Sequence, residues 1–192
     1  MRVMYYFKRR LLTCLSMTLV MLLGVASASA YSQDVDQKQR LVKAAFILNI
    51  AKFVTWPEAS YQTRPKQLVL CHYRQDVLEE AYEIIRRRKV GARQLQAKLI
   101  DDMAAASQCD MILVAKEEMA SLLDDSASLS SDPVLVIADM TDQEGQGVAY
   151  KHVSVALVRR GSRIGFEINL QEAKRLGLVL SSELLKLAQI VE

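Results

Sequence analysis

Short apolar runs alternate along the chain with segments in which polar residues recur at regular spacing. The strongest runs are Gln67–His72, Cys109–Ala115 and Pro133–Asp139, and the last two are continuous, as in strands buried on both faces of a sheet. A short strand is also expected at Gln96–Ile100, and apolar positions at helical spacing predict helices over 76–88 and 116–123. Strands that alternate with helices imply an α/β domain with a mainly parallel sheet and helices on both faces.

A basic run ends the predicted helix 76–88. It comprises Arg86, Arg87, Arg88 and Lys89, and Gly91 follows. Cations in a last turn complement the helix dipole, and glycine suits the position after a helix end. The run therefore indicates a solvated helix end rather than a binding patch.

The first strongly apolar segment after residue 30 predicts a helix from about Asp36 to Val54, with Pro57 as the stop. At 3.6 residues per turn, Arg40 and Lys43 fall on one side, whereas Asn49 and Lys52 fall on nearly the opposite side. No single polar face results. The pattern favours a core helix that is buried on several sides, and the alternative is a surface for a dimer or another partner.

The pattern changes to strict alternation near the C-terminus. The segments 153–158 and 163–170 flank a turn at Arg159–Ser162, and they predict a hairpin with one wet face at an antiparallel edge of the sheet. A short helix from Asn169 to Gly177 and a last helix from about Ser181 to Ile190 follow. No internal repeat or linker interrupts residues 31–192, so a single domain is expected.

Residues 1–30 have the features of a cleaved signal peptide. A basic start with Arg2 and Lys8 to Arg10 precedes the apolar run Leu11–Val25, which is too short to span a bilayer comfortably. The small residues Ala28 and Ala30 form an A-x-A cleavage signal, so the mature chain is expected to be residues 31–192. An uncleaved N-terminal anchor is the alternative.

Removal of this segment changes the charge of the protein. The formal net charge of the whole chain is +3, and residues 1–30 carry four basic and no acidic residues, which leaves a mature chain near −1. The slightly basic character therefore belongs to the signal segment, and the composition does not indicate a nucleic-acid binder.

Motifs for cofactor, metal or nucleophilic chemistry are weak. The mature chain has one G-x-G, at Gly145–Gly147, without the third glycine of a dinucleotide-binding turn, and it has no P-loop. Cys71 and His72 are adjacent in a predicted strand, so their side chains point to opposite faces and cannot easily share a metal ion or a proton. His152 is the other histidine, and no protease or hydrolase signature surrounds Cys71.

Cys71 and Cys109 are the two cysteines of the mature chain, and in an oxidising compartment two cysteines suggest one disulfide. The predicted strands pose a difficulty, because Cys71 ends one strand and Cys109 begins another. If neighbouring parallel strands had matched starts, the two Cα atoms would be roughly 13 Å apart, and a disulfide needs them within about 7 Å. A disulfide therefore requires either staggered strands or a Cys109 that precedes its strand.

Several stretches together resemble the YfiR family of small exported proteins. In chain order they are "KAAFILNIAKFVTWP", "LVLCHY", "CDMILVA", "PVLVIAD" and "IGFEINLQEAKRLGLVLSSELLKLA". The last is the most specific, and the resemblance covers nearly all of residues 41–191. Two departures are visible: many members have G-G-M-I where this chain has Gly147–Tyr150, and some regulatory members carry a second cysteine pair that this chain lacks.

The resemblance implies a Rossmann-like α/β sheet, a periplasmic location and self-association, so a homodimer is expected. It also implies a cysteine pair at Cys71 and Cys109. The best-understood members bind the periplasmic sensor domain of an inner-membrane diguanylate cyclase of the YfiN type. They hold that cyclase inactive and so lower cyclic di-GMP and biofilm formation. The resemblance therefore predicts a non-catalytic periplasmic regulator with no cofactor and no catalytic or metal site.

Two other functions stay open from the sequence. One is a small exported thiol enzyme with Cys71 as the nucleophile, which requires that thiol to be free. The other is a periplasmic small-molecule binding module linked to an outer-membrane receptor, which requires a pocket.

Overall fold

The computed structural model describes residues 35–125, 129 and 132–192. The predicted signal segment 1–30, with its cleavage point after Ala30, lies outside the described residues. The chain divides into two units, Met1–Gln39 and Arg40–Glu192, and the fold that follows is that of the second unit.

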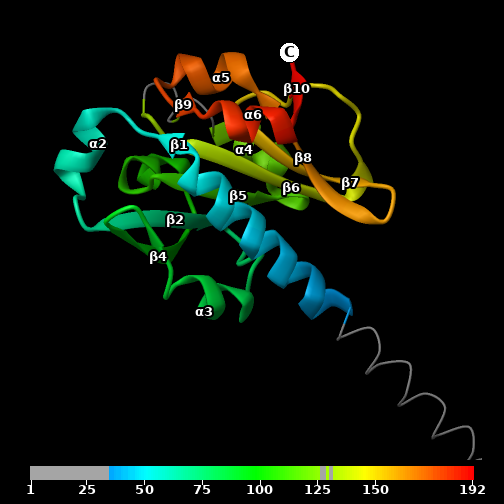
Figure 1. Cartoon of the computed structure of the whole chain (residues 1–192), viewed down its shortest axis with the longest axis horizontal. Coiled ribbons are helices and arrows are strands. Elements are labelled where there is room, and N and C mark those ends of the chain that lie inside the picture. Colours follow the sequence, from blue (N-terminus) through cyan, green and yellow to red (C-terminus); the bar gives the residue numbers. More distant parts are fainter. Residues whose placement is uncertain (1–34, 126–128, 130–131) are drawn as a thin grey trace, which may run out of the picture. The chain divides into compact units, whose positions relative to one another are not determined.

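An eight-stranded sheet organises this unit, with the strand order β10-β8-β7-β6-β5-β2-β4-β3 (Figure 1). Its strands are β2 (Gln67–Tyr73), β3 (Lys89–Val90), β4 (Arg93–Ile100), β5 (Met111–Ala115), β6 (Leu135–Glu144), β7 (Val155–Arg160), β8 (Arg163–Asn169) and β10 (Gln189–Val191). The β3–β4 and β7–β8 pairs are antiparallel, and the other neighbours in this sheet are parallel. The predicted α/β fold, with a mainly parallel sheet and an antiparallel hairpin, is confirmed, and the sheet is strongly curled.

Helices cover both faces of the sheet, as the alternation of strands and helices predicts. They are an N-terminal helix (35–52, of which residues 40–52 belong to this unit), α2 (Glu58–Thr63), α3 (Ala81–Ile85), the 3₁₀ helices η1 (Met103–Gln108) and η2 (Lys116–Glu118), α4 (Met119–Asp125), α5 (Leu170–Arg175) and α6 (Ser182–Leu187). Two further strands, β1 (Val54–Thr55) and β9 (Val179–Leu180), pair with each other in a small antiparallel sheet.

Two apolar clusters form the core, one on each face of the sheet. Side chains of β2 alternate between them: Leu68 and Leu70 join the cluster under the N-terminal helix, α3, α5 and α6. Val69 and Cys71 join the cluster under η1 and α4. This period of two places Cys71 on the face of the sheet that η1 covers.

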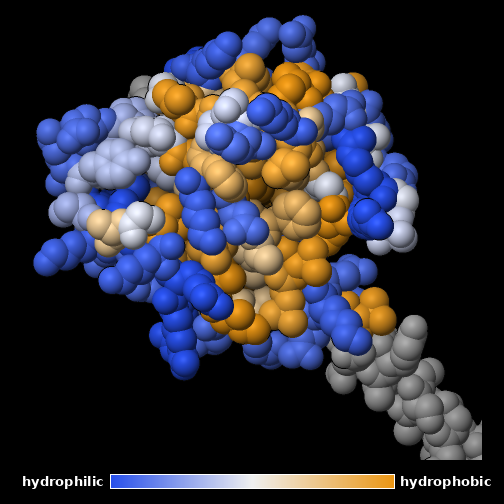
Figure 2. Space-filling model, viewed as in Figure 1, coloured by the Kyte–Doolittle hydropathy of each residue, from blue (hydrophilic) through white to orange (hydrophobic). Residues whose placement is uncertain are grey.

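The N-terminal helix is a core helix with a partly apolar outer side. Ile47 and Ile50 are fully buried against the sheet, whereas Val42 is exposed, as is Phe53, the residue after the helix. Phe46 also makes an edge-to-face contact with Phe166 of β8, with 5.9 Å between the ring centroids. Figure 2 shows apolar side chains gathered on the face along which this helix runs.

The predicted helix 76–88 is wrong in length, since α3 comprises only Ala81–Ile85. Asp76 accepts hydrogen bonds from the backbone N–H groups of Leu78 and Glu79, and Glu79 has φ +47, which no helix interior tolerates. The basic run follows the end of α3 and continues into β3. Gly91, with φ +59, turns the chain between β3 and β4 and does not cap a helix. The strand expected at 96–100 begins three residues earlier, at Arg93.

The predicted last helix is also too long. α6 begins after Ser181, whose hydroxyl accepts from Leu184 N–H, but it ends at Leu187. Gln189–Val191 then form β10, which pairs in parallel with β8 and buries Val191. The hairpin β7–β8 consequently lies inside the sheet, and the expectation that it forms the edge is wrong.

Candidate functional site

The structure joins Cys71 and Cys109 in a disulfide, with their Cα atoms 5.8 Å apart. The expected offset of about 13 Å does not arise, because β5 begins at Met111, which lies opposite Leu70, three residues into β2. Cys109 is not part of β5 at all but follows η1 as its C-cap residue. Each of the two arrangements that would allow a disulfide, a stagger of the strands and a Cys109 that precedes its strand, is therefore present.

The two histidines are separated from this sulfur chemistry. His72 is buried, and its Nδ1 lies 3.1 Å from Asp76 Oδ1 without the alignment of a hydrogen bond. Burial lowers the pKa of His72, and the charge of Asp76 opposes that shift only in part. His152 lies beside Glu172, with 4.0 Å between Nδ1 and Oε1, and burial lowers its pKa too.

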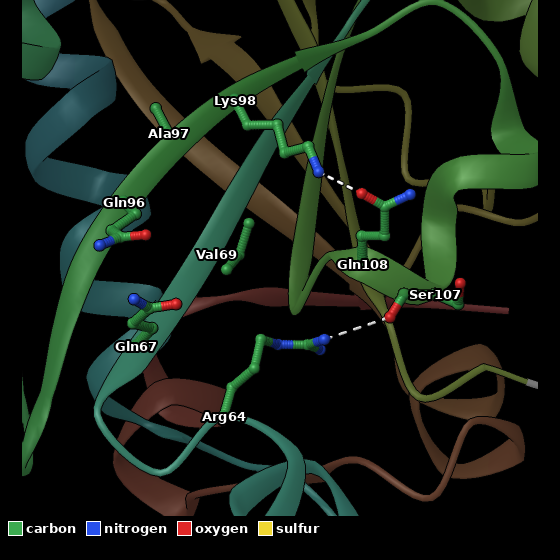
Figure 3. Close-up of a pocket in the computed structure, with 8 residues that line it drawn as sticks. All are labelled: Arg64, Gln67, Val69, Gln96, Ala97, Lys98, Ser107 and Gln108. Carbon is green, nitrogen blue, oxygen red and sulfur yellow. Dashed lines mark hydrogen bonds between the residues drawn. The ribbon is translucent and has the colours of Figure 1, made fainter.

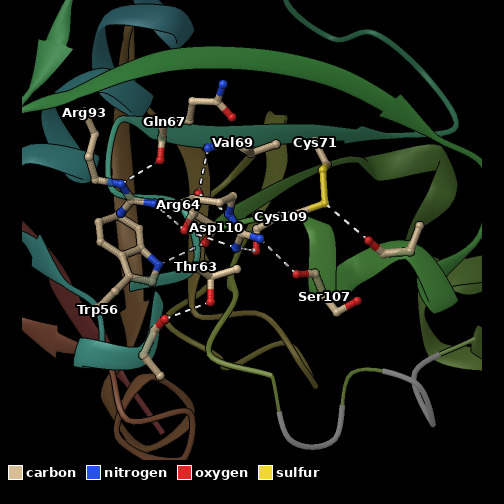
Figure 4. Close-up of polar contacts among 12 residues, drawn as sticks. Trp56, Thr63, Arg64, Gln67, Val69, Cys71, Arg93, Ser107, Cys109 and Asp110 are labelled. Atoms are coloured by element: carbon tan, nitrogen blue, oxygen red, sulfur yellow. Dashed lines mark hydrogen bonds and ion pairs between the residues drawn. A yellow bond between two sulfur atoms is a disulfide. The ribbon is translucent and has the colours of Figure 1, made fainter. Parts of the chain in front are cut away.

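A buried carboxylate directly after the disulfide forms the centre of a polar network, which Figure 4 shows. The carboxylate of Asp110 is inaccessible to solvent. Its Oδ1 accepts from Arg93 Nη2 at 2.5 Å, and its Oδ2 accepts from the backbone N–H of Val69 at 2.7 Å. Arg64 donates to both oxygens at 3.4 Å. Asp110 thereby connects α2, β2 and β4 to the start of β5.

Aromatic side chains enclose the cationic partner of Asp110. The guanidinium of Arg93 lies 5.6 Å from the ring centroid of Trp56 and 5.2 Å from that of Tyr61. Trp56 in turn donates from Nε1 to the carbonyl of Asp110 at 3.1 Å. Arg93 Nε also donates to the carbonyl of Gln67 at 2.7 Å. Stacking and hydrogen bonds together hold this arginine away from water.

A pocket of about 330 Å³ opens beside this network, over the face of β2 and β4 that η1 only partly covers (Figure 3). Its lining is mainly polar and cationic, and it consists of Arg64, Gln67, Val69, Gln96, Ala97, Lys98, Ser107 and Gln108. Arg64 donates from Nη1 to the carbonyl of Ser107 at 3.2 Å and from Nη2 to the carbonyl of Cys109 at 3.3 Å. Lys98 donates to the side-chain oxygen of Gln108.

This arrangement suits binding rather than nucleophilic chemistry. Cys71 is fully buried and bonded to Cys109, so its sulfur is not a nucleophile in this state. Within the described residues, no group of three or more His, Cys, Asp or Glu side chains could hold a metal ion. In the same part of the chain, no helix is long and apolar enough to cross a membrane.

Sequence reasoning identified the two cysteines but missed Asp110, Arg93, Arg64 and Trp56. One signal was available for Asp110, because an acid directly before a continuous apolar strand needs a partner once it is buried. Arg93 carried no such signal, since the strand was expected to begin after it.

The chain was compared with curated proteins and with solved structures. No curated protein matches the sequence. Among solved structures, the chain is similar to a crystal structure of an ABC domain in complex with L-Trp from Streptococcus pneumonia, with 11% identity and a TM-score of 0.45. That match covers 66% of this chain and 55% of the other, so the chain spans about half the length of that structure.

The sequence also matches the YfiR/HmsC-like family over residues 40–189, which is most of the chain and nearly all of the second unit. Proteins of this family are generally regulatory. The disulfide between Cys71 and Cys109 fits an exported protein. The chain belongs to the YfiR/HmsC-like family.

Proposed function

We propose that this protein is a non-catalytic periplasmic regulator, which binds the periplasmic sensor domain of an inner-membrane diguanylate cyclase of the YfiN type and holds the cyclase inactive. The family match over residues 40–189 carries the proposal. Repression would lower cyclic di-GMP and biofilm formation. Differential binding suffices for this role, because a ligand that prefers the inactive state of a protein shifts its population toward that state.

Export is part of the same proposal. Residues 1–30 direct the chain across the inner membrane and are removed after Ala30, and residues 31–192 act in the periplasm as a homodimer. The disulfide supports this compartment, since such bonds persist in oxidising environments and are rare in the cytosol. N-terminal sequencing of the secreted protein tests the cleavage point, and light scattering of the purified protein tests the dimer.

The thiol-enzyme alternative has a specific obstacle. A nucleophile must present a thiolate to its substrate, whereas the sulfur of Cys71 is bonded to Cys109 and fully buried. The binding-module alternative keeps one supporting observation, the polar pocket beside η1.

The proposal is tested in cells and with purified components. Deletion of the gene should raise cyclic di-GMP in a strain that contains the cyclase and should leave it unchanged in a strain that lacks the cyclase. The purified protein should also retain the cyclase from solubilised membranes. Unchanged cyclic di-GMP after deletion in the cyclase-containing strain, across growth conditions, would contradict the proposal.

A further inference from the structure

The pocket between η1, β2 and β4 lies in a region with too few acidic groups for its cations. Arg64 and Arg93 share one carboxylate, that of Asp110, and the contact of Lys98 is with the neutral amide of Gln108. Arg64 and Lys98 both line the pocket, and acidic side chains are not part of its lining. An anion in the pocket would offset this excess of positive charge.

Arg64, one of the two cations that line the pocket, is held in place before any ligand arrives. The guanidinium of Arg64 is held by the carbonyls of Ser107 and Cys109 as well as by Asp110, and 18% of its side chain stays exposed. Its position therefore requires little ordering when a ligand binds, and preorganisation of this kind raises affinity. A planar guanidinium also matches the geometry of a carboxylate.

A second cavity, beside α3 and β4, is larger, but its arginines are not held in a comparable network. It is lined by Tyr82, Arg86, Arg87, Gln94, Leu95 and Gln96. Arg86 is already paired with Glu83 there, and both side chains are about half exposed. An exposed arginine loses side-chain entropy when a ligand fixes its position, and its charge is screened by water. The pocket beside η1 is therefore the better candidate.

The other residues that line the pocket indicate the chemical class of the ligand. Gln67, Gln96 and Gln108 offer amides, which both donate and accept hydrogen bonds, and Val69 supplies a small apolar surface. A volume of about 330 Å³ lies at the small end of ligand sites. We propose that this pocket binds a small organic carboxylate that carries further hydroxyl or amide groups, with its anionic group against Arg64 and Lys98.

The disulfide controls one wall of this site. Ser107 and Gln108 belong to the last turn of η1, and Cys109, the next residue, is bonded to Cys71 in the sheet. The bond therefore fixes the carbonyl that orients Arg64 and the amide that contacts Lys98. Reduction leaves this turn held against β2 by non-covalent contacts alone, so carboxylate binding depends on the redox state of the bond.

Calorimetric titration of the protein recovered from the periplasm tests this inference, with citrate, tartrate and succinate as probes and inorganic phosphate as the competing anion. The single tryptophan, Trp56, contacts Asp110 and gives a second readout by fluorescence. At least one carboxylate should bind saturably with one site per chain. Lys98→Gln should weaken it about tenfold, since a charge-assisted contact contributes roughly 1.4 kcal/mol or more.

Lys151→Gln is the matched control, because Lys151 is an exposed lysine in a turn outside the pocket. This variant should bind as the wild type does, and thermal melting should show both variants folded. A reductant should weaken carboxylate binding in the wild type. The inference is overturned if no carboxylate binds saturably, if phosphate alone binds, or if Lys98→Gln and Lys151→Gln have equal effects.

Discussion

Arg93 Nη2 lies 2.5 Å from Asp110 Oδ1, at a point where the Arg93 side chain is 4% exposed and the Asp110 side chain is not exposed at all. This buried ion pair links the first residue of β4 to the residue directly before β5, although β2 lies between these two strands. The carboxylate also accepts from the backbone N–H of Val69 in that central strand. One side chain thus fixes the N-terminal ends of three strands relative to one another.

Asp110→Asn should destabilise the protein severely. The amide keeps the size of the carboxylate but removes its charge, which leaves the guanidinium of Arg93 buried without a counter-charge. Breaking a buried pair from one side typically costs about 3–5 kcal/mol. The free energy of unfolding from urea titrations measures the effect.

Asp142→Asn is the control for that substitution. Asp142 pairs with Lys116, and both side chains are more than a third exposed. Exposed pairs contribute about 0–1 kcal/mol, so this change should be nearly neutral. Equal losses of unfolding free energy in Asp110→Asn and Asp142→Asn would show that the buried pair contributes no more to stability than the exposed pair.

Loss of the disulfide should lower stability by up to about 4 kcal/mol, because the bond closes a loop between cysteines 38 residues apart. A Cys71→Ala, Cys109→Ala double variant is preferable to serine substitution, since both positions are buried and a hydroxyl would need a partner there. The oxidised wild type should melt above both the reduced wild type and the double variant. Identical melting of all three would show that the bond contributes nothing to stability.

Much of the fold could be predicted from the periodicity of the sequence. The runs at β5 and β6 are continuously apolar because these strands are central and buried on both faces. The errors fall where local pattern and tertiary pairing disagree. Gln189 and Ile190 continue a helical pattern, but Val191 is buried only when this segment pairs with β8. The local sequence of residues 189–191 does not indicate that they pair with β8.

The site was harder to predict, because its residues meet only through the register of the strands. Cys71 could be matched with Cys109, since cysteines are few and chemically distinctive. Arginines and glutamines are common, and nothing in the spacing of Arg64, Lys98 and Gln108 shows that they line one pocket. That information appears only when η1 lies over β2 and β4.

The stability of the protein should fall as the pH drops through 6.5, the ordinary pKa of histidine. Burial lowers the pKa of His72 below its ordinary value of 6.5, so the unfolded chain takes up a proton under conditions where the folded chain does not. Below pH 6.5 the unfolded state is therefore favoured increasingly, until the pH passes the folded pKa and the loss levels off. Urea titrations at several pH values measure this slope.

His72→Leu should reduce that slope, because it removes a titrating group at a buried position. His152→Asn is the companion variant, since burial lowers the pKa of His152 too and asparagine tolerates its positive φ of 62°. Glu172 acts at lower pH than the histidines, because its ordinary pKa is 4.5 and the hydrogen bond from Arg175 lowers its pKa in the folded protein. An unchanged slope in both variants would contradict the assignment to buried histidines.

Removal of the Tyr82 hydroxyl should weaken the outer side of β4. β3 pairs only with Arg93 and Gln94, so beyond them this side of β4 has no strand neighbour among the described residues. The backbone N–H of Ala97 instead donates to the Tyr82 hydroxyl at 2.7 Å. Tyr82→Phe removes this acceptor and should lower the free energy of unfolding by about 1 kcal/mol.

Hydrogen exchange measures the effect at the Ala97 amide. This amide should lose protection in Tyr82→Phe and should stay protected in the control variant Tyr61→Phe, which keeps the aromatic ring on Arg93. Equal protection of Ala97 in the wild type and Tyr82→Phe would show that the hydroxyl does not close this edge.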